Sequence, residues 1–147
     1  MVFGKSKKTA RVSLGVAQHL ARPDPHWELT CEVAPLDGEL TVIFEGTAPP
    51  SEADVQRVQA AARFAIEASD QLIAALVANF PVDPDDMGVE LATALRTSPG
   101  MVFRLELLRL TLARTGVELG YGIVGWDDAL ATVCVDGTEV GDVYYAD

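Results

Sequence analysis

The sequence predicts an α+β fold in which an antiparallel sheet carries its helices on one face. The first and last thirds of the chain alternate apolar and polar residues with a period of two, which is typical of half-buried strands. The middle third changes to the period of a helix, and turn-forming residues separate the strands. We therefore expect the order βββ-αα-ββββ, with one long and one short helix packed on the sheet.

Three strands are expected before the helices. The alternation places them at residues 12–19, 26–33 and 40–45. Residues 22–25 and 35–38 separate them, and both segments contain the proline, aspartate or glycine residues that tight turns require. The second and third of these strands should pair as a hairpin.

The middle third should form a long helix and then a short one. Ser51 and Asp54 have the spacing of a capping box, so the long helix should begin there and run over residues 51–79. Asp83 and Pro84 supply an N-cap and a first-turn proline for the short helix, which should end near Thr97. The apolar positions of the long helix that should face the sheet include Val58, Leu72, Ile73 and Leu76.

Four more strands are expected at residues 102–113, 117–123, 131–135 and 140–145. In the first of them the apolar residues change parity near Leu107 and Leu108, which indicates either a bulge or a strand that is buried on both faces. Asp136 and Gly137 predict a tight turn between the last two strands, with Gly137 at positive φ.

Composition and charge indicate one acidic domain. A chain of 147 residues, 49% of them hydrophobic, is long enough to bury a single core. All three lysines and one arginine lie in the first eleven residues, and the remainder holds seven arginines against twenty-two acidic residues. We expect a basic flexible tail at residues 1–10 and a single domain over residues 11–147.

The acidic charge also restricts the partners. An acidic domain repels phosphate backbones and anionic lipid headgroups, so nucleic acids and membrane surfaces are excluded and a basic protein is favoured. No apolar run approaches the roughly 20 residues of a membrane helix, and residues 12–19 have a strand pattern rather than that of a signal peptide. Cys31 and Cys134 are too far apart for a zinc knuckle or a redox pair. We expect a cytoplasmic protein with reduced thiols.

Two motifs resemble ligand sites without fulfilling their requirements. Gly120, Gly122 and Gly125 match a dinucleotide-binding fingerprint, but a turn and a hairpin follow them instead of a helix. These glycines should instead let the strand bend or let another element approach its backbone. Residues 83–88 resemble the start of a calcium loop, but Met87 and Ala94 occupy positions that need oxygen ligands. We expect neither a cofactor nor a metal.

Trp126, Asp127 and Asp128 are the candidate partner-binding residues. Tryptophan is enriched in binding hot spots, and neighbouring carboxylates can pair with arginine or lysine on a partner. In the alternative interpretation, Trp126 packs inward beneath a corner of the chain and one aspartate caps the turn.

The segment of residues 119–143 resembles a widespread bacterial family of uncharacterised domains. The resemblance rests on a glycine-aromatic strand, the Trp126-Asp127-Asp128 corner, a valine-rich strand and a glycine turn, and it extends from about Trp27 onward. Family members are often encoded among secreted-toxin and immunity genes, which implies a neutralising or accessory binding role. Many members have Glu-His-Gly after the corner, where this chain has residues 129–131 as Ala-Leu-Ala. No function of that histidine carries over.

Three functions are therefore considered. The first is a cytoplasmic protein-binding domain, of immunity type, that covers a basic surface of a partner with an acidic surface. The second is a small hydrolase or ligand-binding enzyme with a pocket between helix and sheet, for which His19, His26 and the acids of residues 83–86 are the candidates. The third is a structural or oligomerisation module. No stretch of sequence places a nucleophile beside a base.

Overall fold

A computed structural model describes residues 8–112 and 116–146 of the chain. Its first strands are β1 (Thr9–Val12), β2 (Gly15–Leu20), β3 (His26–Glu32) and β4 (Glu39–Glu45). Helices α1 (Glu52–Glu67), α2 (Ser69–Ala78) and α3 (Val89–Thr97) follow, with 3₁₀ turns η1 (Pro84–Asp86) before α3 and η2 (Pro99–Met101) after it. The last strands are β5 (Phe103–Leu110), β6 (Val117–Ile123), β7 (Trp126–Asp136) and β8 (Glu139–Ala146).

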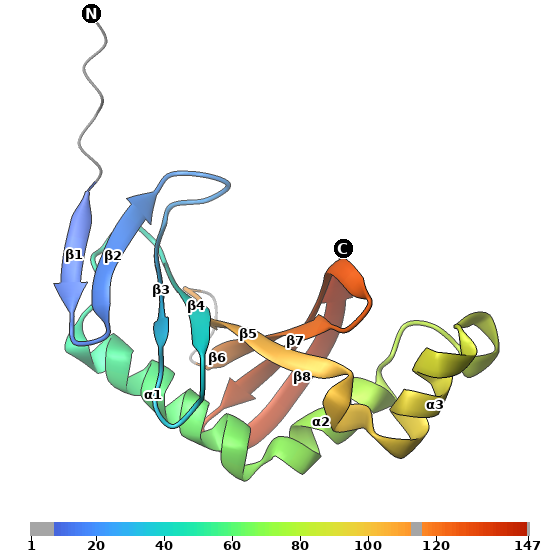
Figure 1. Cartoon of the computed structure of the whole chain (residues 1–147). Helices are drawn as coiled ribbons and strands as arrows, with labels where there is room; N and C mark the ends of the chain where they lie inside the picture. Colours follow the sequence, from blue (N-terminus) through green and yellow to red (C-terminus); the bar gives the residue numbers. More distant parts are fainter. Residues whose placement is uncertain (1–7, 113–115, 147) are drawn as a thin grey trace, which may run out of the picture.

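Within the described residues, the eight strands form one sheet in which spatial order equals chain order (Figure 1). Neighbouring strands are antiparallel, except that β4 and β5 run parallel along residues 41–44 and 107–110. The helices cross beneath the sheet between β4 and β5 (Figure 1). A crossover of this kind is what a parallel pair requires, because it returns the chain to the end at which the previous strand began.

The predicted order βββ-αα-ββββ and the purely antiparallel sheet are wrong. The expected first strand is two strands, because Val12 and Gly15 pair across a two-residue turn and Gly15 adopts a φ of +144°. The alternation of residues 12, 14 and 16 continues through that turn, so the pattern gave no sign of it. The parallel pair was missed because a period of two is the same in parallel and antiparallel strands. The expected pairing of β3 with β4 as a hairpin is confirmed.

The expected long helix begins as predicted but is divided in two. Ser51 Oγ accepts from the Asp54 amide at 3.2 Å, and the Asp54 carboxylate accepts from the Ser51 amide at 2.9 Å, which completes the capping box. The helix breaks at Ala68, whose φ and ψ are −106° and 23°. This break lets α1 pack on β5 and β6 while α2 packs on β7 and β8. Val58, Leu72 and Leu76 are 0% exposed, which confirms their predicted burial, whereas Ile73 is only half-buried at the edge of the core.

The short helix starts later than expected. Residues 84–86 form the 3₁₀ turn η1, and Met87 and Gly88 are extended, so that α3 begins at Val89. Its expected end at Thr97 is confirmed. Figure 1 shows that α3 projects from the end of α2, away from most of the sheet. No residue of α3 is fully buried, although Leu91 and Leu95 contact the edge of the core.

The hydrophobic core lies between the sheet and the α1–α2 pair. Its largest fully enclosed side chains come from both helices, from strands β4 to β7 and from the residue that follows β3: Leu72, Leu76, Leu108, Leu119, Val33, Val42, Val55, Val58 and Val133. Of the expected basic tail, residues 1–7 lie outside the described residues, and Thr9 and Ala10 belong to β1. Ala113, the expected end of the strand that forms β5, also lies outside them.

The C-terminal strands agree with most of the predicted detail. The register of β5 against β6 shifts between Leu105 and Leu107, so a bulge is present, slightly earlier than expected. Asp136 and Glu139 pair at the end of the last hairpin, and Gly137 has a φ of +63°, as predicted. The valine-rich strand β7 is longer than expected because it already begins at Trp126.

Replacing Gly137 by alanine should lower the free energy of unfolding by about 1–2 kcal/mol, because a Cβ disfavours the left-handed region. Urea denaturation of the variant would measure the loss. The space around this glycine is open, with no atom within 4 Å of the position that an alanine methyl would occupy, so backbone conformation alone would be responsible. An unchanged midpoint and slope would contradict this account.

Candidate functional site

The predicted binding residues lie at the start of β7. Trp126 pairs with Ile123 across a turn formed by Val124 and Gly125. The next pair is Gly122 with Leu130, so residues 127–129 form a bulge on one strand. The expected corner is therefore a hairpin turn followed by a bulge, and a bulge redirects the side chains that it carries.

Trp126 is half-buried, and its ring centroid lies 5.4 Å from that of Phe80. The tryptophan thus packs against the chain that leaves α2, in agreement with the inward interpretation. Asp127 and Asp128 are exposed. Asp127 also lines a shallow hollow of about 270 Å³ together with Arg104 and Glu106. The aspartates are therefore open to a partner, while the indole contributes mainly to packing.

The residues considered for catalysis are not brought together. His19 packs edge-on against Trp27, with ring centroids 5.0 Å apart, on the helix-covered face of the sheet. His26 is adjacent to Trp27 in β3 and so lies on the opposite face. The acids of residues 83–86 belong to η1, beyond α2. The expected pocket between helix and sheet that would unite these groups is absent from the pockets found among the described residues.

The glycine fingerprint has a packing function. Gly120 and Gly122 lie in β6, and Gly125 is in the turn before β7, with a φ of +89°. A Cβ on Gly120 would lie 2.8 Å from the Cβ of Leu107, and one on Gly122 would lie 2.5 Å from the Glu106 carboxylate. The glycines of β6 therefore allow β5 side chains to lie close against the strand.

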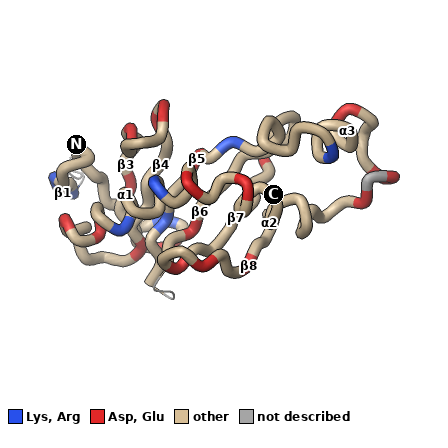
Figure 2. Tube along the Cα trace, turned by 90° about the horizontal axis from the view of Figure 1, so that it is seen from below, with Lys and Arg blue, Asp and Glu red and all other residues tan. Residues whose placement is uncertain are grey.

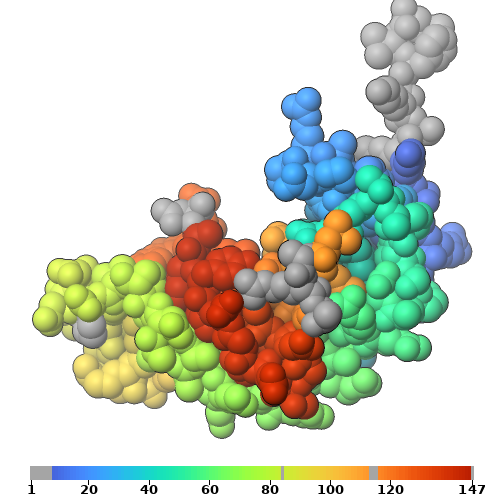
Figure 3. Space-filling view, turned by 180° about the vertical axis from the view of Figure 1, so that it is seen from behind, coloured from blue at the N-terminus to red at the C-terminus, as the bar shows by residue number. Residues whose placement is uncertain are grey.

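A cavity larger than the hollow beside Asp127 lies on the open face of the sheet, opposite α1 and α2. It has a volume of about 690 Å³ and is formed by the β2–β3 connection, β3, the end of β4 and the end of β5. Pro23 and Pro25 restrict the backbone of the connection, which forms one wall. Figure 3 shows the surface hollowed between the segment of residues 20–25 and the C-terminal strands. The aliphatic side chains that line it are Leu20, Ile43 and Leu112.

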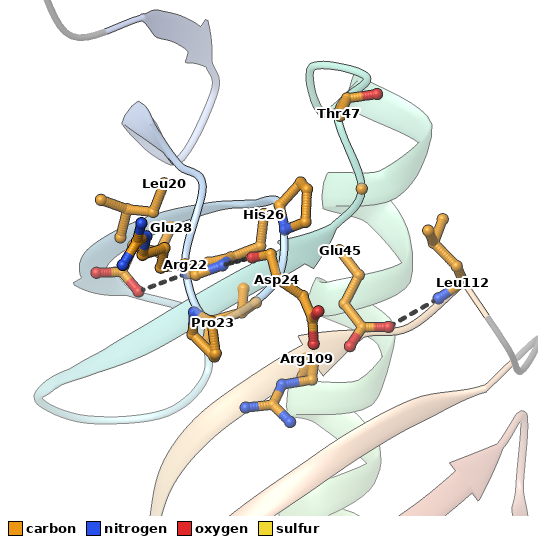
Figure 4. A pocket seen from close by; sticks show the side chains of 13 residues that line it. Leu20, Arg22, Pro23, Asp24, His26, Glu28, Glu45, Thr47, Arg109 and Leu112 are labelled. Atoms are coloured by element: carbon orange, nitrogen blue, oxygen red, sulfur yellow. Dashed lines mark hydrogen bonds and ion pairs between the residues drawn. The ribbon is translucent and has the colours of Figure 1, made fainter.

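Three carboxylates line this open-face cavity, those of Asp24, Glu28 and Glu45. His26 Nδ1 donates to the Asp24 carbonyl oxygen at 2.7 Å, and its Nε2 lies 3.3 Å from Glu28 Oε2. Glu45 Oε1 accepts from the Leu112 amide at 3.0 Å. In Figure 4 the carboxylates of Asp24 and Glu45 point into the middle of the cavity. The side-chain contacts position the carboxylates of Glu28 and Glu45, whereas the contact at Asp24 holds its main chain.

Arg109 and Glu118 continue the polar row across the open face. Arg109 Nη1 lies 3.7 Å from Glu118 Oε1, and Glu118 Oε2 accepts from the Tyr144 hydroxyl at 2.9 Å. The Cys134 thiol lies 4.0 Å from the same carboxylate oxygen. Burial raises the pKa of Tyr144, and the hydrogen bond to Glu118 raises it further. The Tyr144 hydroxyl therefore remains protonated and donates to a carboxylate that is largely enclosed by protein.

A second hollow of about 470 Å³ lies beside Glu118, on the same face. Asp136, Glu139 and Asp142 also line it. The open face is thus acidic on both sides of Arg109. Figure 2 shows the wider distribution: acidic positions occur along the whole described trace, whereas basic positions are few and scattered.

Sequence reasoning missed this open-face cluster. Of its charged side chains, Glu28, Glu45, Arg109 and Glu118 come from the successive strands β3 to β6, and each appeared only as the polar half of an alternating pattern. Asp24 lies in the β2–β3 connection, which the sequence indicated only as a turn. Register brings the strand residues together, because Glu28 pairs with Ile43, Ile43 with Arg109 and Arg109 with Glu118. The sequence does place acidic residues at solvent-facing positions in successive strands. This pattern alone could not locate a site, because the order of the strands in the sheet was unknown.

Searches for similar protein-family models, curated proteins and solved structures found no match to this chain. Among the described residues, no helix has the length and apolarity needed to cross a membrane. In the same residues, no group of three or more histidine, cysteine or acidic side chains is arranged to hold a metal ion. Cys31 and Cys134 are not joined in a disulfide; Cys31 is partly buried and Cys134 is buried.

Proposed function

We propose that this chain is a protein-binding domain that binds a cationic segment of a partner on the open face of its sheet. The observation that carries the proposal is the open-face cavity of about 690 Å³, in which Asp24, Glu28 and Glu45 surround an aliphatic floor. Arginine and lysine have the complementary structure, since an apolar stem carries a charged end. Such a side chain can lay its stem on Ile43 and direct its charge to the carboxylates.

The charge balance of the cavity supports a cationic ligand. Its lining also contains Arg22 and Arg109, but Arg109 lies beside Glu118, which adds a fourth carboxylate at the cavity edge. Glu139 lines the second hollow on the same face and adds an acidic side chain there. Carboxylates outnumber arginines in this lining, and an excess of negative charge over a concave surface accelerates the association of a cationic partner.

Hydrolysis is supported less well by the same cavity. Among the described residues, no serine or cysteine lines it, and both ring nitrogens of His26 are engaged, one by the Asp24 carbonyl and one by Glu28. Thr47 is the hydroxyl residue at its rim, and Figure 4 shows its side chain directed away from His26. A nucleophile activated by a base needs the two groups within hydrogen-bond reach.

The proposal includes a cytoplasmic location and an immunity-type role. The two cysteines form no disulfide, which agrees with a reducing compartment. The resemblance of residues 119–143 to domains encoded near toxin genes would make the partner a basic toxin. In that case the exposed Asp127 and Asp128 provide a second acidic contact, at the end of β7 opposite the Gly137 turn.

An oligo-arginine peptide is the probe for the cationic site. We expect its association rate to fall as salt is raised from low to physiological concentration, because salt screens the attraction. The double variant Glu28→Gln and Glu45→Gln should bind about threefold to tenfold more weakly, since two exposed charge pairs are lost. Stopped-flow fluorescence would give the rates, and anisotropy would give the affinities.

The matched control is the double variant Asp127→Asn and Asp128→Asn, which removes the same charge from the β7 bulge. It should lower affinity by less than about twofold if the open-face cavity is the principal site. A larger loss from this control than from the cavity variant would move the site to the Trp126 region. If both double variants lowered the affinity equally and only slightly, the peptide would be responding to the net charge of the protein and not to one site. That result would overturn the proposed site.

A further inference from the structure

A separate groove lies on the other side of the sheet, where α1 and α2 diverge at Ala68. It has a volume of about 280 Å³, and its walls are mainly apolar, with Ile66 and Ile73 on the helices and Phe103 and Leu105 on β5. Ala65 and Gly100 also line the groove, and their small side chains leave its volume open. Figure 1 shows the change of direction between α1 and α2, beside which the groove lies.

Tyr121 lies at the base of this groove with an unused hydroxyl. Its side chain lines the groove, and the residue is only 5% exposed. The hydroxyls of the other two tyrosines each donate a hydrogen bond, Tyr144 to Glu118 and Tyr145 to the Leu76 carbonyl. Within the described residues, the structure gives the Tyr121 hydroxyl no partner. The fully buried side-chain atoms without a partner among the described residues are His19 Nε2 and Thr111 Oγ1, so the Tyr121 hydroxyl keeps contact with solvent and can donate to an acceptor that enters the groove.

The groove is electrically neutral in an otherwise acidic protein. Among the described residues, its polar lining is limited to Ser69, Tyr121 and backbone, without a charged side chain. Burial raises the pKa of Tyr121 to about 12, so its hydroxyl is a donor at all physiological pH values. At the rim, Ile66 is 47% exposed, and Met101, adjacent to Gly100, is 80% exposed. The surroundings therefore favour an apolar, uncharged ligand with a hydrogen-bond acceptor.

We infer that this groove is a binding site for a small neutral ligand with an apolar ring or chain and one carbonyl oxygen, which accepts from Tyr121. The volume lies just below the usual range of sites for drug-sized molecules, so the ligand is of side-chain size. The apolar part would occupy the space between Ile66, Ile73 and Phe103. This site is on the opposite face from the open-face cavity and does not depend on the proposed protein-binding function.

Acetophenone and α-methylstyrene are the probes, because they have nearly the same shape and only acetophenone carries an acceptor. Titration followed by amide NMR should show both binding at residues around Tyr121. Acetophenone should bind about twofold to tenfold more tightly, as expected for one net hydrogen bond. In Tyr121→Phe this preference should disappear while α-methylstyrene binds as before, and the variant should fold because the hydroxyl has no partner among the described residues.

A second variant tests the position. Gly100→Leu adds a side chain at the groove wall, where no atom lies within 4 Å of the new Cβ, and should abolish binding of both probes. N-acetylphenylalanine amide carries a similar ring on a peptide unit and tests whether the ligand is part of a protein chain. If it binds at the same residues more tightly than acetophenone, the site is supported and its ligand is a peptide side chain. Equal affinity of the first two probes for the wild type, or binding that Gly100→Leu leaves unchanged, would overturn the inference.

Discussion

Replacing Leu76 by alanine is expected to lower the free energy of unfolding by about 2–5 kcal/mol. Leu76 is 0% exposed and lies on the face of α2 that packs against the C-terminal strands. Truncation would remove its apolar contacts and leave a cavity that a helix packed on a sheet cannot close. The Leu76 carbonyl also accepts from the Tyr145 hydroxyl, so the backbone at this position is fixed to β8.

Urea unfolding followed by circular dichroism would measure this loss. Leu112→Ala is the matched control, because it deletes the same atoms from a side chain that is 78% exposed. The control should change stability by less than about 0.5 kcal/mol. Equal losses in the two variants would show that α2 does not bury Leu76 as described.

Replacing Gly116 by alanine should have the next largest effect, a loss of about 3 kcal/mol. A Cβ at this position would lie 2.2 Å from the Val135 carbonyl oxygen and 2.9 Å from its carbon. Both are backbone atoms, so no side-chain rotation can relieve the overlap and the β6–β7 pairing must shift. The contact between Arg57 Nη2 and the Gly116 oxygen, at 3.4 Å, would be displaced as well.

Thermal and urea denaturation would test this, with Gly100→Ala as the control. Nothing lies within 4 Å of a Cβ at Gly100, and its φ is not in the left-handed region, so the control should stay within about 0.5 kcal/mol of the wild type. If Gly116→Ala were as stable as the control, the close approach of the two strands at this point would be refuted.

The sequence predicted the features that depend on neighbouring residues. The capping box at Ser51, the buried positions Val58, Leu72 and Leu76, the turn at Gly137 and the β3–β4 hairpin are all confirmed. Each has a local cause: a side chain that satisfies a backbone amide, a helical spacing of apolar residues, or a glycine in a tight turn. These causes act within a few residues, so they can be recognised without knowledge of the tertiary structure.

The features that depend on distant residues could not be predicted in this way. The direction of β5 relative to β4 is set by the path of the helices, and Ala68 has no proline or glycine to mark the break between α1 and α2. The open-face cavity likewise depends on register across several strands. The candidates Trp126, Asp127 and Asp128 are adjacent in sequence and thus easy to recognise, whereas Glu28 and Arg109 come to lie on either side of Ile43 only in the folded sheet.

The parallel pair β4–β5 joins two halves of the sheet, and its pairing depends on residues that are far apart in sequence. Strands β1 to β4 and strands β5 to β8 are each joined by short connections, so each half can form from contacts that are close in sequence. The four residue pairs between β4 and β5 instead close a loop that contains all the helices. The two halves should therefore assemble first, with the β4–β5 pairing and the α1 and α2 packing forming late. Mechanical force or denaturant should then separate β4 from β5 before either half of the sheet unfolds.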